Sequence, residues 1–134
     1  MKYKELVEAA KRAKEFSFSP YSHFRVGAAL LAKNGKIFLG TNIENSSYSL
    51  TICAERTALF KAISEGEKKF SAIALSTDEN GFTSPCGSCR QVIMDLAGDI
   101  DVILSNTNGK TKIIKASKLI PFAFSDKNLK RTKR

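Results

Sequence analysis

The sequence is poor in several features that mark protein classes. It has no tryptophan, one histidine and three cysteines among 134 residues. Its longest apolar run, Val26 to Ala32, covers seven residues and is too short to span a bilayer, and the N-terminal stretch lacks the apolar block of a secretory leader. An odd number of cysteines does not suit a disulfide framework, so we expect a soluble, cytoplasmic protein with reduced thiols.

The positive charge is unevenly distributed along the chain. The formal charge is +9, and residues 110–134 hold nine Lys or Arg and one acid, whereas the first 109 residues hold 13 bases and 12 acids. A nucleic-acid enzyme would line its groove with basic residues. We therefore predict one domain over residues 1–125 and a basic tail over residues 126–134 that is disordered at its end, with neither membrane nor nucleic acid as a partner.

The apolar pattern predicts a mixed α/β domain. Apolar residues at steps of three or four from Tyr3 to Phe16 predict an amphipathic helix. Two strands joined by a type I′ turn at Asn34-Gly35 follow, and further helices and strands alternate after them. The expected strands are 25–32, 37–41, 70–76, 101–105 and 112–115, and the expected helices are 53–64, 89–97 and a short turn from 117. This order predicts a three-layer fold with a mixed five-stranded sheet flanked by helices.

All three cysteines lie in two short motifs. Cys53 opens C-A-E-R-T-A, and Cys86 and Cys89 form the C-x-x-C of S-P-C-G-S-C-R-Q. Both motifs fall at predicted helix starts, where unpaired N–H groups and the helix dipole stabilise thiolates. Three thiolates suit a tetrahedral zinc ion whose fourth position is left for water, and that arrangement is typical of a catalytic zinc site.

Polar residues follow each cysteine motif. Glu55 does not share a helix face with Cys53, so it is placed to move protons rather than to bind metal, although an acid at a helix start also favours the dipole. Arg56, Arg90 and Gln91 are predicted to donate hydrogen bonds to the sulfurs and offset their negative charge. These residue types predict a metal site with a separate proton carrier.

A second polar pair precedes the first cysteine motif. Asn42 and Glu44 are expected to point to one face of an extended segment, because side chains alternate along it. An amide and a carboxylate aimed together suit the hydroxyl groups of a ligand. The single histidine, His23, lies in a loop broken by Pro20, and we interpret it as a surface residue.

At this point the chain resembles the small homotetrameric, zinc-dependent cytidine deaminases of the cytidine deaminase superfamily. The resemblance rests on C-A-E and P-C-G-S-C-R-Q, and also on P-Y-S-H-F-R-V-G-A-A-L, G-T-N-I-E-N-S-S-Y and L-I-P-F-A-F. It covers residues from about 6 to 129. It implies hydrolysis of a cyclic amidine C–N bond, converting cytidine and deoxycytidine to uridine and deoxyuridine plus ammonia in pyrimidine salvage.

The resemblance also implies roles for individual residues. One Zn²⁺ per subunit would be held by Cys53, Cys86 and Cys89, zinc-bound hydroxide would attack C4, and Glu55 would shuttle protons to the ring nitrogen and the leaving amine. Substrate contacts are implied for Phe24 against the base, for Asn42 and Glu44 on the ribose hydroxyl, and for the backbone of Ala54 and Ser84 at the polar edge of the pyrimidine. Tyr48 and Phe124 would reach the site of a neighbouring subunit in a homotetramer with shared sites.

Three alternatives stay open from the residues alone. The enzyme could deaminate another cytosine compound such as a nucleoside antibiotic, it could act on single-stranded nucleic acid, or the chain could be a non-catalytic zinc module. Asn42 and Glu44 favour a nucleoside with a sugar hydroxyl. The near-neutral charge of the first 109 residues argues against nucleic acid, and the lack of a fourth cysteine argues against a structural zinc site.

Overall fold

A single five-stranded sheet organises the protein. The computed structural model describes residues 3–129, and its strands lie in the order β2-β1-β3-β4-β5. Only β3 and β4 are parallel, and the other neighbours are antiparallel. The elements in chain order are α1 (Lys4–Lys14), β1 (Val26–Ala32), β2 (Ile37–Thr41), the 3₁₀ turn η1 (Tyr48–Leu50), α2 (Ala54–Ser64), β3 (Phe70–Thr77), α3 (Gly87–Ala97), β4 (Asp101–Ser105), β5 (Thr111–Lys115), α4 (Ala116–Leu119) and α5 (Asp126–Leu129). The predicted mixed five-stranded fold is confirmed.

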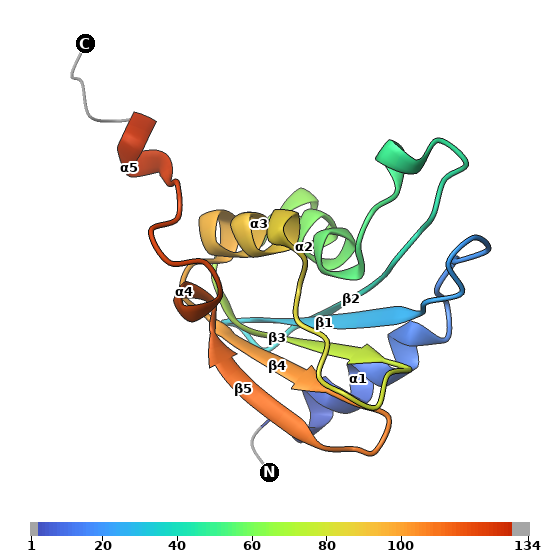
Figure 1. The fold of residues 1–134 in the computed structure, drawn as a ribbon. Coiled ribbons are helices and arrows are strands. Elements are labelled where there is room, and N and C mark those ends of the chain that lie inside the picture. The colour runs from blue at the N-terminus through green and yellow to red at the C-terminus, as the bar shows by residue number, and fades with distance from the viewer. Residues whose placement is uncertain (1–2, 130–134) are drawn as a thin grey trace.

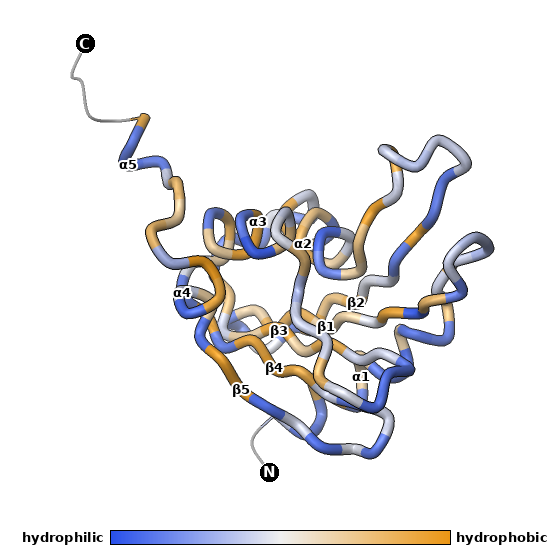
Figure 2. Tube along the Cα trace, in the orientation of Figure 1, coloured by the Kyte–Doolittle hydropathy of each residue, from blue (hydrophilic) through white to orange (hydrophobic). Residues whose placement is uncertain are grey.

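Helices cover both faces of this sheet. Figure 1 shows α1 on one face and α2 with α3 on the other. Successive strand residues alternate between the two cores, as in β1, where Leu30 packs toward α2 and Ala29 packs toward α1. In Figure 2 the inner strands β1, β3 and β4 are largely apolar, whereas the edge strand β5 is partly hydrophilic. No helix within residues 3–129 is both long and apolar enough to cross a membrane.

Two glycines let helices approach the sheet closely. A Cβ placed on Gly27 of β1 would lie 2.1 Å from the Ala10 carbonyl oxygen of α1. A Cβ on Gly40 of β2 would lie 2.4 Å from the Ala54 carbonyl oxygen of α2. Each face of the sheet therefore has one point where a helix backbone touches strand backbone, and the contact on the second face lies at the start of the helix that follows Cys53.

Several local predictions are wrong. The hairpin between β1 and β2 has a positive φ at Gly35 (95°) but not at Asn34, and the Gly35 N–H donates to the Ala32 carbonyl (3.0 Å). This is a three-residue loop with a type I turn and a glycine bulge, not a type I′ turn. Phe16 was expected on the buried face of the first helix, but α1 ends at Lys14 and Phe16 is 79% exposed.

Differences also occur toward the C-terminus. α3 begins at Gly87, two residues before the predicted start, because Cys86 already serves as its N-cap. The predicted tail begins with the short helix α5, Asp126–Leu129, and the predicted disorder at its end concerns residues 130–134, which lie outside the described part of the chain.

Candidate functional site

Three thiols converge where α2 and α3 begin. Cys53 is the N-cap of α2, Cys86 is the N-cap of α3, and Cys89 lies in the first turn of α3. Their sulfur atoms all lie within 4.8 Å of one another, and all three cysteines are free of disulfides. The backbone of both motifs is extended at the N-cap and helical after it, so each helix directs its unpaired N–H groups toward the cluster.

The geometry of this cluster fits zinc. In a tetrahedral site with Zn–S bonds of about 2.3 Å, two sulfurs lie about 3.8 Å apart. The Sγ atoms of Cys53 and Cys86 are 3.8 Å apart. Within residues 3–129 the group of clustered metal-binding side chains consists of the three cysteines alone, so this chain offers three soft ligands and leaves a fourth position for a small molecule.

Arg56 lies against the thiols as the sequence predicted. Its Nη2 donates to Cys53 Sγ at 3.3 Å, and this bond raises the pKa of the guanidinium. The pKa of Cys53 falls to about 5 because Cys89 and Arg56 donate hydrogen bonds to its sulfur, whereas the bond to Cys53 and burial raise the pKa of Cys89. Positive charge beside the cluster therefore favours the anionic form that binds metal.

Glu55 is a buried acid next to the cluster. The residue is 5% exposed, and desolvation raises the pKa of its carboxyl group to about 7. It lines the same cavity as Cys53 and Cys86. A carboxyl group with a pKa near neutrality exchanges protons readily in both directions, and this is the property that general acid–base catalysis requires.

Arg90 and Gln91 lie elsewhere than predicted. Arg90 donates to the carbonyls of Pro85 (2.8 Å) and Leu119 (2.9 Å) and to the Ser84 hydroxyl (2.6 Å), so its guanidinium ties the loop before α3 to the end of α4 rather than contacting a sulfur. Gln91 Nε2 donates to the Phe124 carbonyl at 2.9 Å. Both side chains therefore hold the C-terminal segment against α3.

The thiols lie at one end of a cavity of about 300 Å³. Five of the predicted substrate-contacting residues line it: Phe24, Asn42, Glu44, Ala54 and Ser84. The cavity thus runs from the cysteine cluster and Glu55 to the loop that carries Asn42 and Glu44. One end offers soft metal ligands, and the other offers polar hydrogen-bonding groups.

Asn42 and Glu44 do lie on the same side of their segment. Both line the cavity, while Ile43 between them forms β-bridges with Phe18 and Ile52. Glu44 accepts hydrogen bonds from the Tyr21 and Ser22 backbone N–H groups (2.9 and 3.1 Å) and from the Ser22 hydroxyl. The Ser22 hydroxyl is the main reason that the pKa of Glu44 is lowered, so this carboxyl group is an acceptor.

Two predicted substrate contacts lie outside this cavity. Tyr48 is 74% exposed and packs edge-on against Tyr21 with ring centroids 5.8 Å apart, and Phe124 is 57% exposed. His23 is exposed on the loop after α1, in keeping with the prediction of a surface histidine.

Sequence reasoning missed part of the cavity lining. The residues it did not single out are Ser22, Val26, Thr51, Ile52, Leu75, Thr77 and Thr83. Ser22 belongs to the P-Y-S-H-F motif, and that motif could have identified it as a residue of the cavity. Leu75 and Thr77 come from β3, and only the sheet order, which places β3 between β1 and β4, brings that strand end beneath the cysteine motifs.

Comparison with known proteins adds independent findings. Residues 1–105 match the family model described as the cytidine and deoxycytidylate deaminase zinc-binding region. A cytidine deaminase from Sporosarcina psychrophila is 49% identical over 130 residues, which is 96% of each chain. A cytidine deaminase structure from Burkholderia pseudomallei superimposes with a TM-score of 0.89 at 46% identity, over 92% of this chain and all of the other. A blasticidin-S deaminase from Bacillus cereus is 35% identical over 90% of this chain and 91% of its own length.

Proposed function

Since the chain belongs to the cytidine and deoxycytidylate deaminase zinc-binding family, we propose that it hydrolyses cytidine and deoxycytidine to uridine and deoxyuridine with release of ammonia. One observation carries the proposal. A buried acid with a pKa near neutrality, Glu55, adjoins three clustered thiols at the end of a cavity that also exposes an amide and a carboxylate. We place this activity in cytoplasmic pyrimidine salvage.

We assign the metal to the three thiols. Cys53, Cys86 and Cys89 would hold one zinc ion, and Arg56 would offset the charge that three thiolates place on it. Zinc, when bound, acts as a Lewis acid and lowers the pKa of a water molecule in its open position. The chain itself supplies the ligand geometry, the neighbouring positive charge and a site partly shielded from solvent.

Glu55 would carry the protons of the reaction. Its carboxylate would take a proton from the attacking water and deliver it to the ring nitrogen, and would then take the remaining proton of the added hydroxyl group and deliver it to the amine that leaves. Burial makes this transfer possible at neutral pH because it brings the pKa of Glu55 to about 7. The backbone at Ala54 and Ser84 would hold the polar edge of the pyrimidine, and Phe24 would pack against its face.

Asn42 and Glu44 would hold the sugar. They lie at the polar end of the cavity and present an N–H donor and a carboxylate acceptor, which together match a hydroxyl group. This pairing supports a nucleoside substrate over free cytosine. The sugar contacts would also fix the distance of the base from Glu55 and the thiols.

A homotetramer with shared sites is part of the proposal. Tyr48 and Phe124 are largely exposed, and Phe122 is fully exposed. Aromatic side chains of this kind gain most from burial at a contact between subunits. Sedimentation of wild type beside Phe124→Ala tests this: we expect a tetramer whose activity falls when Phe124 is truncated.

The first experiment measures cytidine deamination by its ultraviolet absorbance change, with zinc counted, in wild type and Glu55→Gln. We expect wild type to be active and Glu55→Gln to retain zinc and lose about 10²–10⁴-fold in kcat, the usual contribution of a positioned proton carrier. Glu65→Gln, at the end of the same helix, is the matched control and should remain active. A wild type that binds zinc but leaves both nucleosides unchanged would overturn the proposal.

A further inference from the structure

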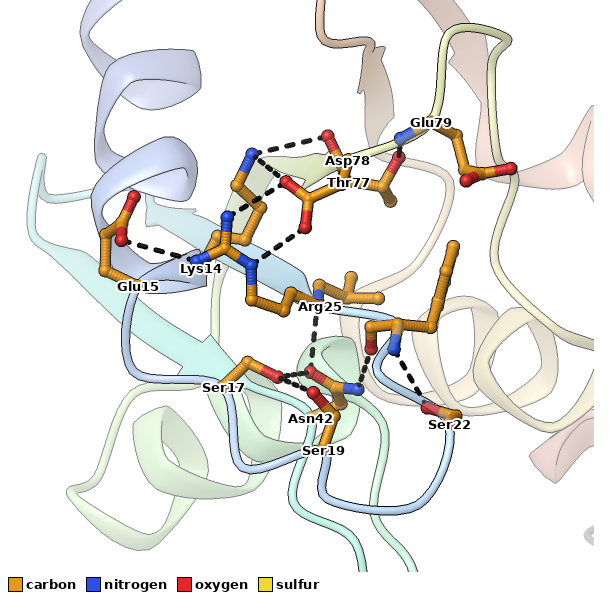
Figure 3. A network of polar contacts seen from close by, with 12 residues as sticks. Lys14, Glu15, Ser17, Ser19, Ser22, Arg25, Asn42, Thr77, Asp78 and Glu79 are labelled. Atoms are coloured by element: carbon orange, nitrogen blue, oxygen red, sulfur yellow. Dashed lines mark hydrogen bonds and ion pairs between the residues drawn. The ribbon is translucent and has the colours of Figure 1, made fainter.

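The Asn42 amide is held by three hydrogen bonds within the chain. Its Oδ1 accepts from the Val26 backbone N–H (3.0 Å) and from the Ser17 hydroxyl (2.5 Å). Its Nδ2 donates to the Phe24 carbonyl (2.7 Å). The close-up in Figure 3 shows Ser17 beside this amide, opposite the β1 backbone. Asn42 is 8% exposed, so these contacts are shielded from water.

These contacts fix what Asn42 can offer to a ligand. A flipped amide would aim Nδ2 at the Val26 N–H and Oδ1 at the Phe24 carbonyl, and both contacts would be repulsive. In the observed orientation both lone pairs of Oδ1 are used. What remains for a ligand is the second N–H of Nδ2, which has no partner within residues 3–129. Asn42 therefore meets a substrate as a donor.

The backbone that binds Asn42 is itself anchored. Arg25, between Phe24 and Val26, donates to both carboxylate oxygens of Asp78 (2.8 and 3.1 Å). Lys14 at the end of α1 also pairs with Asp78 at 2.9 Å (Figure 3). Ser17 lies three residues beyond the end of that helix, and its N–H donates to the Lys14 carbonyl at 3.1 Å. This hydrogen bond ties Ser17 to the end of α1, and from there its hydroxyl contacts Asn42.

We propose that Ser17 is a positioning residue for the sugar of the substrate. Ser17 does not line the cavity, so it would act through Asn42. By occupying the second lone pair of Oδ1 it leaves the amide as a pure donor, polarises the remaining N–H and holds it toward the cavity. Glu44, which already accepts three hydrogen bonds, is a pure acceptor.

The pair then recognises a group that both accepts and donates. A hydroxyl meets this requirement, because its oxygen accepts from Asn42 and its proton goes to Glu44. An ether oxygen satisfies Asn42 alone, and an ammonium group satisfies Glu44 alone. This inference rests on the proposed nucleoside activity and adds to it the residue that sets the chemical selectivity of the sugar end.

A purely structural tie between α1 and the Asn42 loop is the competing explanation. If Ser17 were only such a tie, its loss would lower the stability of the protein and would change the kinetics with all substrates equally. A positioning role instead changes KM while kcat stays constant, because the sugar contact is made equally in the bound ground state and the transition state. A positioning role also affects only substrates that have the sugar hydroxyl, so substrates with and without this group distinguish the two explanations.

The test compares Ser17→Ala with wild type on cytidine and on dideoxycytidine, which lacks both secondary sugar hydroxyls. For cytidine we expect KM to rise about fivefold, the worth of one hydrogen bond, with kcat within about twofold. For dideoxycytidine we expect no difference in kcat/KM between the two proteins. Ser17→Thr, which keeps the hydroxyl, should restore the cytidine KM.

Ser19→Ala is the matched control. The Ser19 hydroxyl oxygen lies 3.2 Å from that of Ser17, but within residues 3–129 it makes no hydrogen bond to the Asn42 amide, so this variant should keep the wild-type KM. An equal loss on both nucleosides, or an unchanged cytidine KM in Ser17→Ala, would overturn the inference while leaving the proposed function standing. If Ser17→Ala folds poorly, Ser17→Cys, with a weaker donor, should give an intermediate KM, and a wild-type KM there would count equally against it. A wild type inactive on cytidine would instead contradict the proposed function.

Discussion

The two faces of the sheet differ in what they pack. Toward α1 the strands present mostly alanines, Ala29, Ala72 and Ala74, and toward α2 and α3 they present larger side chains such as Leu30 and Ile73. Small residues let α1 lie close to the strands. The other face packs α2 and α3 against bulkier side chains (Figure 1). The N-termini of these two helices carry the three thiols.

The two faces also differ in the polar residues that they contain. The α1 face contains an ion-pair network, in which Asp78 pairs with Lys14 and Arg25 next to the segment that holds Asn42. The α2 and α3 face contains the cysteines, Glu55 and Arg56. Substitutions on the first face should therefore act mainly on stability and on sugar binding, and those on the second should act on metal binding and turnover.

The strongest test of this contrast substitutes the two close-contact glycines. A Cβ at Gly27 or Gly40 would meet helix backbone at 2.1 or 2.4 Å, so Gly27→Ala and Gly40→Ala should each lower the free energy of unfolding by about 3 kcal/mol. Only Gly40→Ala displaces the start of α2, which holds Cys53. We expect it alone to lower zinc affinity, measured by chelator competition on the folded fraction.

Gly27→Ala is the control for Gly40→Ala, because the two variants introduce the same kind of backbone clash on opposite faces of the sheet. Urea unfolding establishes that the two losses of stability are comparable. Equal loss of zinc affinity in Gly27→Ala would break the contrast and indicate that the sheet transmits strain from one face to the other.

A smaller effect is expected at Arg56, on the α2 and α3 face of the sheet. Arg56→Ala removes the donor to Cys53 and should lower zinc affinity and kcat/KM by about 10–100-fold, as is typical for residues that support metal ligands. Arg12→Ala on α1 removes an exposed charge from the other face and should change neither quantity. Full zinc content and unchanged turnover in Arg56→Ala would show that its charge does not support the site.

The smallest effect concerns the ion pairs of the α1 face. Arg25, and then Lys14, lower the pKa of Asp78 from 3.8 to about 2. The stabilisation is therefore complete above about pH 4 and is lost as the pH falls through 2. Since the Asp78 side chain is 39% exposed, we expect only about 1 kcal/mol. The free energies of unfolding of wild type and Asp78→Asn, measured in urea, should differ by this amount at pH 6 and converge near pH 2. The zinc content of the two proteins at pH 6 should be the same. A difference in free energy that persists at pH 2 would contradict the prediction.

The parts of the fold that local rules govern were predictable. The strand from Ile37 to Thr41 has the predicted bounds because alternation and a glycine-bearing turn define it locally. The cysteines could be placed at helix starts because an extended residue followed by helix formers is a local pattern. Arg56 could be assigned to Cys53 for the same reason, since three positions separate them on one helix face.

Contacts between distant segments were not predictable in this way. Arg90 lies four positions after Cys86, close to the spacing of Arg56 from Cys53, but its guanidinium donates to the Leu119 carbonyl, 29 residues away, and not to a sulfur. The Ser17 contact with Asn42 spans 25 residues and depends on where α1 ends. The turn at Asn34-Gly35 also differed, because a three-residue loop needs a positive φ at Gly35 alone.

The position of β3 in the sheet has a consequence for the order of events during folding. The β1–β2 and β4–β5 hairpins are local and can form within microseconds, whereas pairing β3 with β1 and β4 closes longer loops. Cys53 precedes β3 in the chain, and Cys86 and Cys89 follow it. The fold holds the thiols together once β3 has docked between the hairpins, so the complete metal site belongs to this late step, and bound metal would slow the reverse step by linking the segments on either side of β3.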